Sequence, residues 1–532
     1  MCQKKEALKF SATDVYRQQM EPAAIISFFL TAAQWNARQN GSQVLGGPSI
    51  IVSERGRAVD AAAIMKAIKV DSARRIISCI ICVLVPSIFW FAPLPIDPIA
   101  KHALAIALFM VLAWITEVVD HSVAGLIGCF LFWTLGVVRF DVAFSGFANE
   151  TPWFLFGATL MGVVASKSGL ARRLAYYVML RVGTTYPRIL LGLIVTDFLL
   201  TLVIPSGIAR VVIMAAIALG LVEAFRLQPG SNEARGMFLI ITYTATLFDK
   251  MIIAGASSIT ARGLIERIGE VDVQWSQWFV AFLPCLVVTV IAAWLLTLWL
   301  FPPEKTELAT AQSYLSDELR KLGPFSAMEI KATALLAGAA LLWMTDFIHH
   351  ISPAKIGLGI GLAALVPYVG LLGVDDLKRV NFLPVFFVAA ALGMAQVLVV
   401  TKGLDLLTNV VFAWMQPLMT GNFTSTIVLY WAAFFYHMLL SSDIAMLGTS
   451  MPLLMNFAKT YGHNPLAIGM IWVFASGGKI FVYESTVLIV GYSFGYFRAR
   501  DLLRIGLLLT LIEFIAILLI VLFYWPLIGI HW

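Results

Sequence analysis

The residues with the most evident chemistry in this 532-residue chain are charged side chains inside apolar segments. Lys250 and Lys479 each stand in an apolar stretch, while Arg210 and Asp443 closely follow short breaks containing serine. Charged side chains at membrane depth are costly and usually functional. Ammonium and guanidinium groups compensate the charge of a small anion, and arginine can hold a carboxylate with two hydrogen bonds. These four positions therefore predict a binding site for a small anion.

Each cation also has a structural alternative. Lys250 adjoins Asp249 and Lys479 has Glu484 nearby, so either lysine can pair with a carboxylate or extend toward water. Arg210 can instead be an arginine at the cytoplasmic edge of the membrane, where this residue type is common.

Asp443 has two interpretations. Its carboxylate can bind a cation or carry a coupling proton, with Glu484 as a second coupling-ion candidate, or it can cap a helix that begins at Ile444. His437 either relays a proton or is hydrogen-bonded within the bundle. The remaining candidates for anion binding supply hydroxyl groups or helix N-terminal amides at the same breaks, and they are Ser206, Gly207, Ser257, Ser442, Ser485 and Thr486.

The composition places these residues in a membrane protein. The chain is 60% hydrophobic and only 13% charged, with a mean hydropathy of +0.87. A soluble chain carries about a quarter charged residues, so lipid must cover much of this surface. Its long apolar stretches predict an all-α polytopic membrane protein with roughly 11 spans and re-entrant hairpins.

The net charge of +6 does not indicate a nucleic-acid partner, because lysine and arginine cluster beside the apolar stretches. This distribution predicts a cytoplasmic N-terminus, and we expect the cell inner membrane as the location. We find none of the motifs G-x-S-x-G, H-E-x-x-H or the P-loop, so we expect no enzyme. No metal site or cofactor is expected, and Cys79 and Cys82 are interpreted as packing residues.

Four short motifs recur in the same order, which predicts two homologous halves. W-I-T-E at 114–117 returns as W-M-T-D at 343–346, and L-G-V at 135–137 returns at 372–374. S-K-S-G-L at 166–170 returns as T-K-G-L at 401–404, and S-G-I-A at 206–209 returns as S-D-I-A at 442–445. The expected domains are a cytoplasmic tail at 1–74, a first repeat at 75–301, a polar linker at 302–328 and a second repeat at 329–532. Inverted repeats would meet near the midplane, where interrupted helices form a substrate site.

From about residue 104 to 530 the chain resembles the divalent anion:sodium symporter family. The resemblance rests on W-I-T-E, F-S-G-F-A-N at 144–149, W-F-L-F-G-A at 153–158, K-L-G-P at 321–324, N-P-L-A-I-G at 464–469, R-A-R-D-L at 498–502 and W-P-L-I-G at 525–529. It implies two inverted repeats, a homodimer, an elevator-like transport domain, and dicarboxylates, tricarboxylates or sulfate as substrates. The family binds sodium and substrate at a Ser-Asn-Thr motif on each hairpin tip.

This chain departs from that pattern at the site itself. Ser206 and Ser442 keep the serine of each motif, but both asparagines and both threonines are replaced. A second family signature, Thr-Pro-Pro, is replaced by A-S-S at 256–258 and E-S-T at 484–486. Lys250 and Lys479 would then take the place of sodium ions.

The leading hypothesis is a secondary carrier of small divalent anions, with dicarboxylates as the expected substrates and sulfate as the alternative substrate. It acts as an exchanger, a proton-coupled carrier or a symporter that still binds a sodium ion. The alternative is a cation/proton antiporter that uses Asp249, Asp443 and Glu484 as ligands. The two lysines count against this alternative, because they raise the local positive potential.

Overall fold

The computed structural model describes residues 50–52, 58–228, 230–304, 311–440 and 442–531. Contacts divide the chain into two compact units, residues 1–80 and 81–532. In the first unit, strands β1 (Ile50–Val52) and β2 (Ala58–Asp60) pair antiparallel, and helix α3 (Ala61–Phe91) begins. Most of the predicted 1–74 tail lies outside the described residues.

The second unit is helical throughout its described residues. Its first part comprises α4 (Pro98–Thr116), α5 (His121–Thr134), α6 (Phe140–Ala143), η1 (Ser145–Ala148), α7 (Glu150–Lys167), α8 (Leu170–Val182), α9 (Tyr186–Thr201), α10 (Gly207–Ala224), α11 (Asn232–Met251), α12 (Ala256–Gly269) and α13 (Trp275–Leu300). Helix α14 (Ala311–Lys321) follows, inside the region predicted as the linker.

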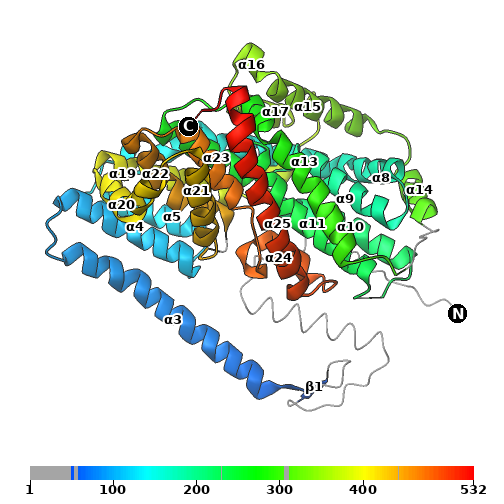
Figure 1. Ribbon diagram of the computed structural model, residues 1–532, viewed down its shortest axis with the longest axis horizontal. Helices are drawn as coiled ribbons and strands as arrows, with labels where there is room; N and C mark the ends of the chain where they lie inside the picture. Colours follow the sequence, from blue (N-terminus) through cyan, green and yellow to red (C-terminus); the bar gives the residue numbers. More distant parts are fainter. Residues whose placement is uncertain (1–49, 53–57, 229, 305–310, 441, 532) are drawn as a thin grey trace. The chain divides into compact units, whose positions relative to one another are not determined.

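The later part comprises α15 (Ala327–Met344), α16 (Asp346–His349), α17 (Pro353–Ala363), α18 (Val374–Leu377), α19 (Leu383–Val400), α20 (Gly403–Phe412), η2 (Ala413–Leu418), α21 (Asn422–His437), α22 (Asp443–Tyr461), α23 (Pro465–Ala475), η3 (Val482–Glu484), α24 (Thr486–Ser493) and α25 (Ala499–Leu519). The chain continues through a π-helical turn, η4 (Ile520–Tyr524), and ends with η5 (Trp525–Ile528). Figure 1 shows these helices along the chain.

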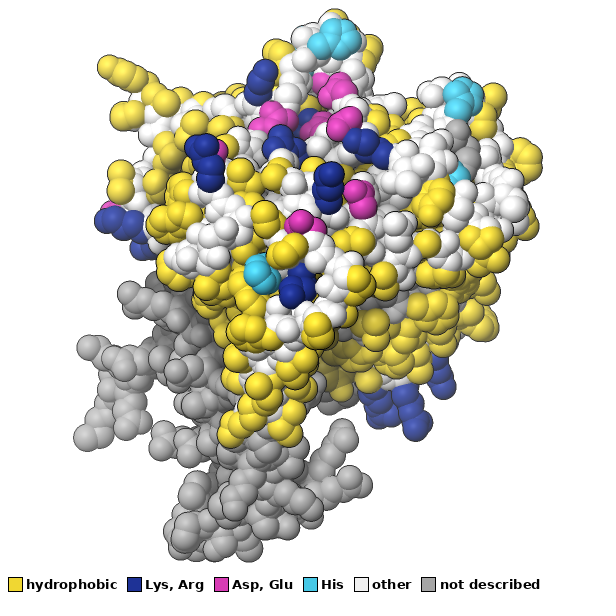
Figure 2. Space-filling view, turned by 90° about the vertical axis from the view of Figure 1, so that its left-hand side faces the viewer, with side chains coloured by type: hydrophobic (Ala, Val, Ile, Leu, Met, Phe, Trp, Pro, Cys, Tyr) yellow, Lys and Arg dark blue, Asp and Glu magenta, His cyan; other side chains and the backbone are white. Residues whose placement is uncertain are grey.

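The expected all-helical polytopic membrane protein is confirmed. Among the described residues, 7 helices are long and apolar enough to cross a membrane, or 8 if α7 and α8, bent by 67°, are counted as one span. Large hydrophobic side chains are exposed along such helices, for example Ile291 and Trp299 on α13. In Figure 2 hydrophobic side chains cover a broad area, and most acidic side chains lie above it. The count of roughly 11 spans and the inverted repeats stay predictions.

The recurring tryptophans have matching roles in the two halves. Trp114 is buried at the end of α4, and its indole N–H donates to the carbonyl of His121, the first residue of α5. Trp343 is buried at the end of α15, and its indole N–H donates to the carbonyl of Pro353, the first residue of α17. Each tryptophan therefore ties the end of one helix to the start of the next apolar helix.

Two hairpins and two interrupted helices surround the candidate site. Helices α9 and α10 form the first hairpin, and α21 and α22 form the second. Helix α11 is interrupted before α12, and α23 is interrupted before α24. Because α12 packs along α22, and α24 packs against α10 and α11, elements from the two parts of the chain are interleaved at this place.

Candidate functional site

Both hairpin tips end in a serine that caps the following helix. The hydroxyl oxygen of Ser206 accepts the amide N–H of Ala209, and the hydroxyl oxygen of Ser442 accepts that of Ala445. A cap of this kind satisfies one of the free amides of the first turn and leaves the others, with the positive end of the helix dipole, near the tip. Ser442, and not Asp443, therefore caps α22, which leaves the Asp443 carboxylate available for other contacts.

Gly207 allows the first tip to pack tightly. A Cβ atom at this position would lie 2.9 Å from the carbonyl oxygen of Ala245 on α11 and 3.0 Å from the side chain of Val487 on α24. Any larger residue would push α10 away from these helices. Gly207 therefore fixes the tip beside both interrupted helices.

The interrupted helices add two further N-termini. Ser257 is buried in the first turn of α12, and Ser485 caps α24 by accepting the amide N–H of Val487. Thr486, the first residue of α24, is exposed. Glu484 is fully buried, and its carboxylate accepts the amides of Ile480 and Phe481, so it stabilises the backbone of the break.

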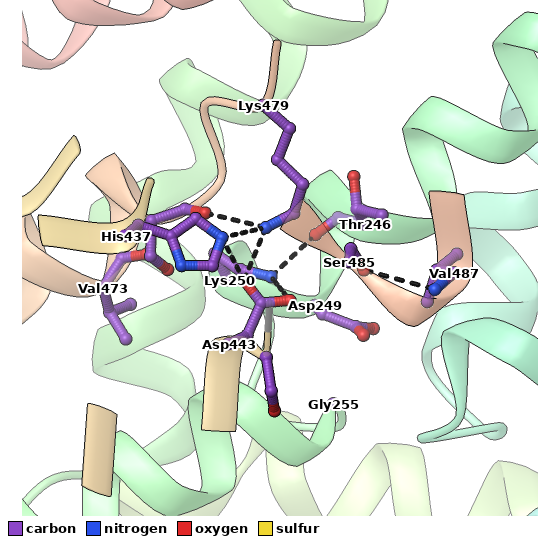
Figure 3. Close-up of polar contacts among 12 residues, drawn as sticks. Thr246, Asp249, Lys250, Gly255, His437, Asp443, Val473, Lys479, Ser485 and Val487 are labelled. Atoms are coloured by element: carbon purple, nitrogen blue, oxygen red, sulfur yellow. Dashed lines mark hydrogen bonds and ion pairs between the residues drawn. The ribbon is translucent and has the colours of Figure 1, made fainter. Parts of the chain in front are cut away.

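The two lysines converge on one carboxylate. The ammonium nitrogen of Lys479 lies 2.6 Å from Oδ1 of Asp443, and that of Lys250 lies 3.1 Å from Oδ2. Lys479 also lies 2.7 Å from Nε2 of His437 and donates to the carbonyl of Ser476. Lys250 donates to the carbonyl of Thr246. Figure 3 shows both ammonium groups and the imidazole of His437 directed toward the carboxylate of Asp443.

Arg210 lies in a second, adjoining ion-pair cluster. It is fully buried, and its guanidinium donates to the carboxylates of Asp197 on α9 and Asp249 on α11 at 3.1 and 2.8 Å. It also donates to the carbonyls of Ile204 and Ala245. Four of its five N–H groups are thus bound to the protein, and the side chain joins the first hairpin to α11.

The formal charges of the two clusters balance. Lys250, Lys479 and Arg210 supply three positive charges, and Asp443, Asp249 and Asp197 supply three negative charges. All six side chains are largely buried, so removal of any one partner leaves another charge without compensation. The arrangement can hold a small anion between ammonium groups and helix N-termini, provided that the Asp443 carboxylate moves away from Lys250 and Lys479.

The sequence predicted Lys250, Lys479 and Asp443 as site residues, but Asp197 was not among the predicted residues. A signal was present, because Asp197 is a single carboxylate inside the apolar stretch 189–204. Tyr243 was not predicted either, and its hydroxyl donates to the carbonyl of Lys479 and holds the break in place. Within the described residues, no group of three histidine, cysteine, aspartate or glutamate side chains is arranged to hold a metal ion.

Comparison with known proteins gives a consistent assignment. The profile of the family described as sodium:sulfate symporter transmembrane region matches residues 73–531. The citrate/succinate antiporter of Escherichia coli (strain K12) is 25% identical over 403 residues, 72% of this chain and 80% of that protein. The L-tartrate/succinate antiporter of the same strain is 24% identical with the same coverage, and the putative malate transporter YflS of Bacillus subtilis (strain 168) is 27% identical over 58% of this chain and 66% of its own length. The chain therefore belongs to the divalent anion:sodium symporter family that its motifs predicted, and it is an integral membrane transporter and not an enzyme.

Proposed function

We propose that this protein exchanges small dicarboxylate anions across the membrane without a requirement for sodium. The observation that carries the proposal is the position of the Asp443 carboxylate between the ammonium groups of Lys250 and Lys479. An internal carboxylate seated between two lysines marks a place with the charge and the donors that a substrate carboxylate needs. The relatives named above, two succinate antiporters and a putative malate transporter, support dicarboxylates as the class of substrate.

In this proposal a substrate carboxylate displaces Asp443 from the lysine pair. The second carboxylate of the substrate lies against the helix N-termini at the tips and breaks, where free amides and the hydroxyls of Ser206, Ser442 and Ser257 are available. Thr486 is exposed and contributes only after a movement of α24. The two ammonium groups of Lys250 and Lys479 compensate the two charges of the dianion, which lowers the cost of holding it at membrane depth.

Fixed cations replace sodium ions at both tips. At the second tip Lys479 joins the break to α22, and at the first tip Arg210 joins α11 to α10. Arg210 then holds the tip together and does not clamp the substrate, because its donors are bound to Asp197 and Asp249. A cation that is part of the protein needs no ion gradient, which favours exchange over symport.

A second candidate is proton-coupled transport. Asp443 competes with the substrate for the same two lysines, so a proton on Asp443 would free them to bind the anion. Glu484 contributes less to such coupling, because its carboxylate is held by the amides of the break. Protonation of Asp443 would then accompany each substrate molecule.

The matching order of hairpin and interrupted helix in the two parts of the chain supports two inverted repeats and an elevator movement of the site. By the same family relationship we propose a homodimer. We propose the cell inner membrane as the location, and lysine and arginine beside the spans support a cytoplasmic N-terminus.

Uptake of labelled succinate into proteoliposomes tests the proposal. One set of vesicles is preloaded with unlabelled succinate and another is empty, and each is assayed in sodium or in choline buffer. Exchange predicts uptake only into preloaded vesicles and at the same rate in both buffers. Uptake into empty vesicles that follows a proton gradient would favour proton coupling, and uptake only in sodium buffer would contradict the proposal.

A further inference from the structure

A buried carboxyl group lies outside the site described so far. Glu513 stands in the middle of α25, within the most apolar of the candidate spans, and it is 1% exposed. Helix α25 packs along α13, and α13 in turn packs against α11. A carboxyl group at this depth needs either a counter-charge or a proton.

The surroundings of Glu513 supply little compensation for a negative charge. Oε1 accepts one hydrogen bond, from the hydroxyl of Thr289 on α13 at 3.2 Å. Oε2 is fully buried and has no partner, and no lysine, arginine or histidine lies within ion-pair distance, among the residues that the structure describes. The other titratable groups facing Glu513 are Cys285 on α13, Tyr430 on α21 and Tyr243 on α11.

Neither tyrosine can solvate an ionised Glu513. The hydroxyl of Tyr430 donates its hydrogen to the carbonyl of Thr510, and the hydroxyl of Tyr243 donates to the carbonyl of Lys479. Each phenol has one hydrogen to donate, and both are used. A carboxylate at position 513 would therefore have one hydroxyl donor and no ion-pair partner among the residues that the structure describes.

The same contacts connect Glu513 to the lysine pair. One turn earlier on α25, Thr510 packs against Gly478, where a Cβ atom would lie 3.0 Å from its side chain. A Cβ atom on Gly506 would lie 2.2 Å from the carbonyl oxygen of Lys479, so α25 lies directly on the break that carries this lysine. Glu513 is also an electrostatic neighbour of Lys250 and Lys479.

We propose that Glu513 is a proton-binding site whose protonation is linked to occupation of the lysine pair by an anion. This inference rests on the proposed function for the lysine pair as the anion site and for the identity of the anion. With a proton, Glu513 is neutral and the full charge of the lysines attracts an anion. Without it, a second negative charge faces the same lysines and weakens anion binding. Linkage requires the reciprocal effect, so a bound anion must favour the protonated acid.

Infrared difference spectroscopy of the purified protein tests the proton site directly, because a protonated carboxylic acid in an apolar environment has its own carbonyl band. We expect the band in the wild-type protein, its loss in Glu513→Gln, and its retention in Asp501→Asn, a control on the same helix. The band should disappear as the pH rises and Glu513 loses its proton. Saturating succinate should raise the pH of this disappearance by about one unit, which corresponds to about tenfold tighter succinate binding when Glu513 is protonated. In Glu513→Gln the affinity for succinate should keep its low-pH value across the same range.

The absence of a Glu513-dependent band in the anion-free protein would overturn the proposal, whatever the protein transports. A band that does not respond to succinate, although calorimetry shows that succinate binds, would also overturn it. If calorimetry shows no succinate binding, the proposed function fails for this anion. The same titration with sulfate then decides the linkage, where a shift of the band supports it and bound sulfate without a shift overturns it.

Discussion

The ammonium nitrogen of Lys479 lies 2.6 Å from Oδ1 of Asp443, so a buried ion pair joins the break after α23 to the first turn of α22. Lys250 reaches the other oxygen of the same carboxylate from α11. One aspartate on the second hairpin is therefore held by lysines from both halves of the chain. We expect anion binding and its pH dependence to depend on this centre of Lys250, Lys479 and Asp443.

Replacement of both lysines should abolish transport. In Lys250→Ala/Lys479→Ala the anion loses both ammonium groups, and uptake of succinate into proteoliposomes should fall to background while expression is retained. Because the double variant leaves Asp443 buried without its two lysine counter-charges, the free energy of unfolding should fall by about 3–5 kcal/mol. The triple variant that adds Asp443→Asn removes this strain and should fold normally yet still fail to bind succinate. Unchanged uptake in the double variant would remove the lysines from the site.

Neutralisation of Asp443 should strengthen anion binding. Asp443→Asn removes the internal competitor for the lysine pair, so calorimetry at neutral pH should show a lower Kd for succinate than in the wild-type protein. If Asp443 carries a coupling proton, the pH dependence of uptake should flatten as well. Asp405→Asn, a change at a carboxylate outside the cluster, serves as the control. A variant with wild-type affinity and an unaltered pH profile would show that Asp443 does not compete with the substrate.

Arg210 should be required for stability of the first hairpin tip. Arg210→Met leaves Asp197 and Asp249 as uncompensated buried charges, with an expected loss of about 3–5 kcal/mol. The melting temperature of the purified protein measures this loss. Arg139→Met is the matched control, because this arginine pairs with Asp141 at the surface, and such pairs contribute about 0–1 kcal/mol. A stable Arg210→Met protein with normal succinate binding would contradict the role that we assign to this cluster.

Close packing of α7 on α17 should depend on Gly157. A Cβ atom there would lie 2.4 Å from the carbonyl oxygen of Gly357 and 2.5 Å from the Cα of Leu358, so Gly157→Ala should cost about 1–3 kcal/mol. Gly338→Ala on α15 meets no atom within 4 Å and should be neutral, or stabilising by up to about 1 kcal/mol. Thermal unfolding of the two variants in detergent distinguishes these outcomes. Equal melting temperatures would show that α7 and α17 are not held in close contact.

Position in the predicted repeat was the most informative signal in the sequence. It placed Ser206 and Ser442 at corresponding tips, and the structure has both serines as helix caps. It also paired Lys250 with Lys479, although their convergence on a single carboxylate depends on the packing of α11 and the α23 break against α22. No local pattern encodes that packing.

The other partners could not be read from the sequence, because they depend on which helix faces which. The sequence left Arg210 as a membrane-edge residue or a substrate contact, and only the packing of α9, α10 and α11 places it between two aspartates. Asp197 and Glu513 each interrupt an apolar stretch, a signal that marks a buried carboxyl group without identifying its partner.

In the proposed function, Lys250 and Lys479 take the place of sodium ions in binding the anion. Calorimetric titration of succinate into the purified protein, in sodium buffer and in choline buffer, tests it most directly. We expect the same Kd in both buffers, and loss of binding in both when Lys250 and Lys479 are replaced. Binding that appears only in sodium buffer would show that a sodium ion still completes the site, and it would contradict the replacement of sodium by lysine.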